Sequence, residues 1–190
     1  MDPNVVGSSS FGVQWSWTSP DSKESWYAKP LTITLNGVEM VVTASSLNVV
    51  RVHSVNGTLI AQRTLQPPFL QSDIGCADIP GAIGTIGTPI IDPATNVMHL
   101  LSKGYKGGAA SGGVANGIYQ MYGLNLPDLT DSPGFPLLID GHAADNDPTR
   151  YFVGGTVLQR PSLATTNGVI IAGFGGVRSR VGSSLSSYCS

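Results

Sequence analysis

A short pattern that occurs three times constrains this chain more than any other feature of its sequence. Each copy places a proline at the entry of a run of β-forming residues, an asparagine six or seven residues later, and an apolar run directly after it. The three prolines lie 59 and 72 residues apart, at Pro30, Pro89 and Pro161. Proline is tolerated at the first residue of a strand, where its missing N–H costs little. The pattern therefore predicts three copies of a strand–turn–strand unit.

The first copy is predicted to form four short strands joined by tight turns. Its two Asn-Gly pairs, Asn36-Gly37 and Asn56-Gly57, are strong signals for two-residue hairpin turns. The alternating and β-branched runs around them predict strands at residues 31–35, 38–43, 48–53 and 58–63. Four antiparallel strands within residues 30–65 are the content of one β-propeller blade.

The second copy is predicted to be a similar unit, and the third is only begun. Further strands are predicted at residues 98–101, 118–124, 137–139 and 169–172. We expect an all-β fold: a partial β-propeller spanning residues 1–176, with about two and a half four-stranded antiparallel blades. The blades are predicted near residues 29–66, 86–140 and 158–176. A complete propeller closes with about 4–8 blades, so this chain holds only part of one.

Three long connections separate these runs, at residues 65–87, 103–117 and 140–155. Gly and Ala occupy most positions of residues 103–117, which predicts a mobile surface loop with nothing to bury. Residues 177–190 are rich in serine and show no apolar alternation, and we expect them to form a disordered tail.

Composition and charge argue against several classes of function. The formal net charge is -2, so the chain has no basic surface that would favour nucleic acid. No apolar run is long enough to span a membrane, and no signal peptide is visible at the start, which leaves the compartment open. The two cysteines, Cys76 and Cys189, are far apart and have no metal-ligand spacing around them.

Three stretches carry a resemblance to a known family. They are residues 72–78 (Ser-Asp-Ile-Gly-Cys-Ala-Asp), 86–95 (Ile-Gly-Thr-Pro-Ile-Ile-Asp-Pro-Ala-Thr) and 159–163 (Gln-Arg-Pro-Ser-Leu). From about residue 10 to residue 176 the chain resembles the quinoprotein-like (PQQ-repeat) β-propeller family of fungi and bacteria. The resemblance implies the fold of the quinoprotein alcohol dehydrogenases and suggests secretion. It implies pyrroloquinoline quinone (PQQ) and calcium as family cofactors, although we expect none for this chain alone.

Asp73, Cys76 and Asp78 form the most suggestive cluster of side chains. Two carboxylates and a thiolate in one loop are a candidate ligand or metal site. Alternatively, the aspartates hydrogen-bond to nearby backbone N–H groups of a turn, which we favour. The family resemblance adds a disulfide for Cys76, because relatives carry a further cysteine in a His-Cys-Asp run that this chain lacks after residue 176.

Other polar residues give weaker signals. His142, Asp145 and Asp147 could form a cation or acid–base site, but their spacing matches no calcium loop and favours a solvated turn. His53 and His99 each lie on a predicted strand, where a lone histidine usually packs or faces solvent. No nucleophile motif is present.

These observations leave three functions open. The first is a partial propeller without catalysis of its own, a truncated form or interaction module that self-associates through exposed strand edges. The second, implied by the family, is a PQQ-dependent oxidoreductase acting on alcohols or sugars, although fold-level analogy is weak evidence for chemistry. The third is sugar or cell-wall binding by the long loops, because Trp15, Trp17 and Trp26 lie close together near the start. Aromatic platforms bind sugars, but buried tryptophans at blade junctions are commoner.

Overall fold

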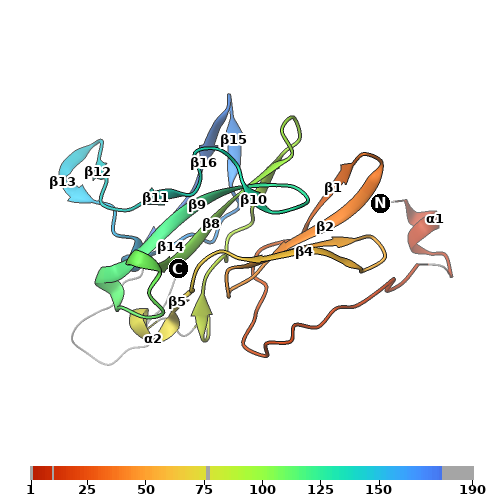
Figure 1. The fold of residues 1–190 in the computed structure, drawn as a ribbon, viewed down its shortest axis with the longest axis horizontal. Coiled ribbons are helices and arrows are strands. Elements are labelled where there is room, and N and C mark those ends of the chain that lie inside the picture. The colour runs from red at the N-terminus through yellow and green to blue at the C-terminus, as the bar shows by residue number, and fades with distance from the viewer. Residues whose placement is uncertain (1, 10, 76–77, 177–190) are drawn as a thin grey trace.

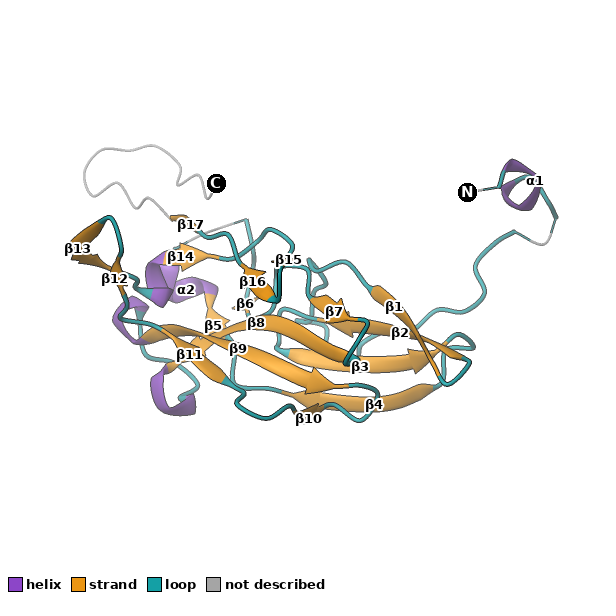
Figure 2. Cartoon of the chain, turned by 90° about the horizontal axis from the view of Figure 1, so that it is seen from above, coloured by secondary structure: helices purple, strands orange, loops and turns teal. Residues whose placement is uncertain are grey.

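The computed structural model describes residues 2–9, 11–75 and 78–176, and these form an all-β fold of several antiparallel sheets (Figure 1). Its helices are short: α1 (Pro3–Val6), α2 (Gln71–Ile74) and three 3-10 turns, η1 (Lys106–Gly108), η2 (Val114–Asn116) and η3 (Gly154–Thr156). No helix in the described residues is long and apolar enough to cross a membrane. The α1 turn stands away from the sheets, at the end of an extended segment (Figure 2).

The first sheet confirms the four strands predicted within residues 30–65. It consists of β1 (Leu31–Leu35), β2 (Val38–Ala44), β3 (Val49–Ser54) and β4 (Leu59–Thr64), antiparallel and in chain order. Asn36 and Gly37 both have positive φ, at 51° and 79°. Two successive residues of positive φ make the turn whose twist matches a β-hairpin, which is why the Asn-Gly pair predicted it correctly.

The second sheet contains β7 (Ile90–Asp92), β8 (Val97–Tyr105), β9 (Gly117–Asn125), β10 (Thr130–Asp131) and β11 (Leu137–Ile139). The strands β7, β8 and β9 pair in chain order. Both β10 and β11 then pair with β9, β10 with one end of it and β11 with its middle. The last strand of this sheet is therefore divided in two by the turn between them.

The prediction of a mobile loop from residue 103 to residue 117 was wrong at both ends. Strand β8 continues through Tyr105, β9 begins at Gly117, and the side chains of Lys103 and Tyr105 are fully buried. Gly104 belongs to the strand because of a close approach: a Cβ at this position would lie 2.6 Å from the side chain of Gln66. Glycine often indicates a flexible loop, whereas Gly104 allows β8 to lie close to Gln66.

Four smaller pairs complete the fold. The third copy of the repeat forms the hairpin of β15 (Ala164–Thr166) and β16 (Val169–Ile171), with its turn at Asn167-Gly168. Strand β14 (Val157–Leu158) pairs with β17 (Gly175–Gly176). The predicted long connections contain the pairs β5 (Phe69–Leu70) with β6 (Ala82–Ile83), and β12 (Ala143–Ala144) with β13 (Asp147–Tyr151).

The second sheet is covered on both faces. One face packs against the first sheet in a cluster that includes Met40, Val42, Val52, Leu100 and Leu124. The opposite face packs against the β15–β16 hairpin in a cluster that includes Leu101, Met121 and Leu163. A further cluster, around Phe69 and Tyr105, joins β5, β6, β14 and the end of β8. The order of packing is therefore first sheet, second sheet, hairpin, as in the chain.

Candidate ligand-binding site

The three tryptophans near the start of the chain lie together on the first sheet. They belong to the N-terminal strap, residues 11–29, which crosses the face of the first sheet opposite the core. Between the strap and the sheet is a cavity of about 300 Å³. We call it the tryptophan pocket, and its lining residues are Trp15, Ser16, Trp17, Trp26, Ala28, Pro30, Thr43 and His53.

The Asn56-Gly57 turn holds the first of these rings. The indole N–H of Trp15 donates a 2.7 Å hydrogen bond to the carbonyl of Val55. Gly57 has a φ of 83°, and a Cβ there would lie 2.8 Å from the Trp15 ring. Only glycine satisfies both conditions without strain. The turn that closes the β3–β4 hairpin therefore also packs against the Trp15 indole and positions it.

A buried ion pair between Arg51 and Glu24 supports the Trp17 ring. Arg51 makes two hydrogen bonds to the Glu24 carboxylate, at 2.7 and 3.0 Å, and its Nε donates to Gln62 at 2.7 Å. The guanidinium carbon then lies 4.4 Å from the centre of the Trp17 ring, which is a cation–π contact. Burial by itself would raise the pKa of Glu24, but hydrogen bonds from Arg51 and Ser19 outweigh it and lower this pKa.

The third ring is the most accessible. Trp26 is 43% exposed, and its ring meets that of Trp17 edge to face, with the centroids 5.8 Å apart. Edge-to-face pairs of this kind are favourable beyond the area that they bury. Trp26 therefore presents an open indole face that is held in place from one side.

His53 forms the polar part of the pocket wall. It is 2% exposed, its ring lies 5.6 Å from Trp15 and 5.7 Å from Trp17, and neither ring nitrogen has a hydrogen-bond partner among the described residues. Burial, with a contribution from the charge of Arg51, lowers its pKa. The ring is thus neutral near pH 7, with one N–H and one lone pair unpaired. Each unpaired buried polar atom costs about 1–3 kcal/mol.

The sequence predicts that His53 packs or faces solvent, and it does not connect this residue with the tryptophans. One signal was present: Arg51 and His53 alternate with Val50 and Val52, so a polar face runs along a buried strand. What the alternation did not indicate is which segment would cover that face.

Asp73 has a well-defined hydrogen-bonding role. Its carboxylate accepts hydrogen bonds from the Tyr105 hydroxyl at 2.5 Å and from the Gly113 N–H at 2.9 Å. The bond from Tyr105 is the main cause that lowers the pKa of Asp73. Burial and the bond to Asp73 raise the pKa of Tyr105 to about 12. Asp73 therefore ties α2 to the glycine-rich loop after β8.

Of the other two members of the predicted cluster, the structure describes only Asp78. Asp78 is exposed, and Cys76, with its predicted disulfide, lies outside the described residues. In the described part of the chain, no group of three or more His, Cys, Asp or Glu side chains could hold a metal ion. The ligand role of Asp73, Cys76 and Asp78 stays a prediction.

The predicted group in residues 142–147 lies at the β12–β13 hairpin. Asp147 accepts hydrogen bonds from the backbone N–H and hydroxyl of Thr149 and from Arg150. These short-range bonds stabilise the start of β13, as expected for a turn residue. His142 lines a separate, mostly apolar cavity of about 400 Å³ with Arg150 and aromatic side chains. Asp145 belongs to the turn between the two strands.

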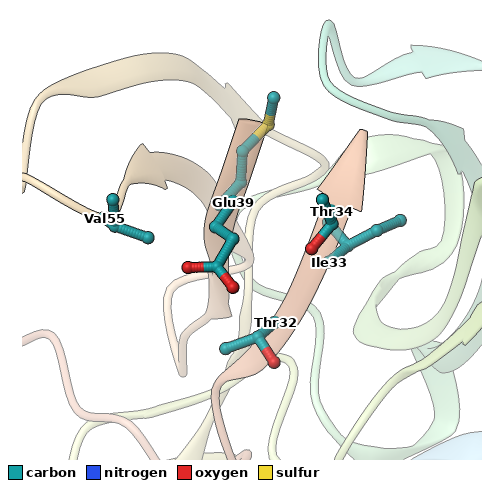
Figure 3. Close-up of a pocket in the computed structure, with 6 residues that line it drawn as sticks. Thr32, Ile33, Thr34, Glu39 and Val55 are labelled. Carbon is teal, nitrogen blue, oxygen red and sulfur yellow. The ribbon is translucent and has the colours of Figure 1, made fainter. Parts of the chain in front are cut away.

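A buried lysine and a cavity on the first hairpin are two further candidate sites. Lys103 is buried, its Nζ donates to the carbonyls of Val157 and Gly155 at 2.7 and 3.3 Å, and it lies 4.3 Å from the centre of the Phe69 ring. Burial lowers its pKa to about 7. A cavity of about 210 Å³ on the β1–β2 hairpin has Glu39 beside two threonines (Figure 3). It has no aromatic wall, so the tryptophan pocket is the stronger candidate.

Comparison with known proteins gives no assignment, because no protein-family model and no curated protein sequence matches the chain.

Proposed function

We propose that this chain is a partial β-propeller of the quinoprotein-like kind that acts as a binding module, with a carbohydrate as the ligand of the tryptophan pocket. The packing of a four-stranded sheet, a five-stranded sheet and a hairpin in chain order supports the propeller. The meeting of three tryptophans in one pocket, with the ring of Trp26 exposed, supports the ligand most directly.

The chemistry of the pocket suits a sugar ring. A sugar presents an apolar C–H face that packs on an indole, and hydroxyl groups at its edge that require hydrogen bonds. Trp26 offers the open indole face, while Ser16 and Thr43 supply hydroxyls. Pockets of this kind, mostly apolar with a few converging polar groups, are typical of small-molecule sites.

Arg51 affects the ligand preference of the tryptophan pocket indirectly. Its charge is neutralised by Glu24 and covered by Trp17, so the pocket presents no free charge from this pair to a ligand. An uncharged sugar therefore fits better than an anion such as a phosphate, and the cation beneath Trp17 disfavours a cationic ligand. The role that we assign to Arg51 is to keep the Trp17 ring in position.

The test is a binding titration followed by tryptophan fluorescence and calorimetry, using oligosaccharides of glucose, N-acetylglucosamine and mannose. We expect at least one series to bind and Trp26→Ala to weaken it about tenfold, which corresponds to about 1.4 kcal/mol, a typical value for an aromatic contact. Tyr151→Ala is the matched control, because Tyr151 is a 62% exposed aromatic on β13, away from the pocket. Absence of binding by all three series, or equal loss in both variants, would exclude the proposal.

A different measurement distinguishes the oxidoreductase alternative from carbohydrate binding. Dye reduction with alcohols or sugars, after addition of PQQ and calcium, would indicate turnover. We expect no dye reduction above that of the protein-free control, because a binding module without catalysis transfers no electrons to the dye. Robust turnover would replace the binding proposal with a catalytic one.

A further inference from the structure

The β15–β16 hairpin has one covered face and one open face. Ile170 and Ala172 pack toward the second sheet. Val169 and Ile171 alternate with them along the strand, point the opposite way, and are 60% and 51% exposed. Their partners across the hairpin, Thr166 and Ala164, are also exposed and share this open face.

The corresponding face is buried in both earlier units. On the second strand of the first unit, Met40 and Val42 are buried against the second sheet. On the second strand of the second unit, Leu101 is buried against the hairpin. The open face of β16 thus continues a series of interfaces in which the same side of each second strand is covered by the next unit. This continuity indicates a docking surface rather than an ordinary solvent-facing side.

At the other end of the stack the equivalent face is covered. The N-terminal strap lies across the first sheet there, held by the buried Arg51–Glu24 pair and by the Trp15 hydrogen bond. A second molecule therefore finds no uncovered sheet face at that end for head-to-tail stacking. Of the two outer faces of the stack in the described residues, only the one on β15–β16 is both apolar and open.

We propose that this open face binds the same face of a second copy of the chain, around a two-fold axis. The four side chains of the patch are uncharged, so two copies meet without like-charge repulsion. A two-fold contact is self-complementary and closes at two copies, whereas head-to-tail contacts would propagate. The patch is small beside a standard interface of about 1,600 Å², so the dimer is expected to dissociate on dilution.

Sedimentation velocity of the full chain under reducing conditions, from about 1 to about 200 µM, tests the proposal. The reducing agent excludes disulfides through Cys76 or Cys189. We expect the mass to rise with concentration from 19.7 kDa toward that of a dimer. The variant with Val169→Glu and Ile171→Glu should stay monomeric over this range, because four carboxylates would face each other in the dimer.

The control carries two glutamates at exposed apolar residues of the first sheet, Val38→Glu and Leu59→Glu, and should dimerise like the wild type. A milder pair, Val169→Thr and Ile171→Thr, keeps the β-branched shape and should weaken dimerisation at least threefold even if the glutamates impair folding. A wild-type monomer at all concentrations overturns the proposal, and so does a mass that rises beyond a dimer. Dimerisation that is unchanged in the threonine variant also overturns it.

Discussion

Replacement of Lys103 by methionine should change how the stability of this protein depends on pH. Lys103 is fully buried, and burial lowers the pKa of its amine from 10.5 to about 7. The unfolded chain therefore binds more protons than the folded one between these two values, and the free energy of unfolding rises with pH across that range. Compared with a side chain that does not titrate, Lys103 lowers the free energy of unfolding by about 4 kcal/mol at pH 7 and by about 2 kcal/mol at pH 9.

The variant Lys103→Met removes this dependence and keeps most of the side-chain volume. Its absolute stability also reflects the loss of two bonds to backbone carbonyls, so the informative quantity is the change with pH. Between pH 7 and pH 9 the wild type should gain about 2 kcal/mol of unfolding free energy relative to Lys103→Met.

Urea unfolding followed by tryptophan fluorescence and far-UV circular dichroism measures both proteins at each pH. The exposed Lys23→Met serves as the control for loss of one lysine, and it should follow the wild type. If the difference between wild type and Lys103→Met is the same at both pH values, Lys103 is not held in an environment that disfavours its charged form, and the reasoning is refuted.

Two further predictions concern contacts that the glycines and Tyr105 provide. Gly57→Ala should lower the unfolding free energy more than Gly37→Ala. Both glycines have positive φ, but only a Cβ at Gly57 would meet the Trp15 ring. Urea unfolding measures the difference, and equal losses of unfolding free energy would contradict the packing role of Gly57. Tyr105→Phe should cost about 1–3 kcal/mol by leaving the Asp73 carboxylate without this donor. Because Tyr105 lowers the pKa of Asp73, the difference in unfolding free energy between wild type and Tyr105→Phe should be largest above pH 3.8 and shrink as the pH falls below it. A difference that stays constant with pH would contradict this.

Local signals predicted the strands of the first sheet well. Asn36 and Gly37 adopt the positive φ values that their side chains tolerate, so the hairpin was predictable from two residues. The same reasoning held for the Asn167-Gly168 turn. Propeller closure, family membership and the ligand role of Asp73 are not decided by such local signals and stay predictions.

The glycine-rich stretch after Ser102 shows where sequence reasoning failed. Flexibility and close packing both favour glycine, and a single sequence does not distinguish them. Gly104 lies against Gln66, 38 residues earlier in the chain, so the burial of Lys103 and Tyr105 depends on a long-range contact.

The sequence by itself determined the turns, the strand content and the positions of three tryptophans, because these depend on φ preferences and on alternation along neighbouring residues. Tertiary structure alone decided that Trp15, Trp17 and Trp26 meet His53 in one pocket, and that Val169 and Ile171 lie on an open face. Both depend on which segment covers which side of a sheet. That choice is made by packing between segments that are distant in the chain, such as the Arg51–Glu24 pair, and has no local signature.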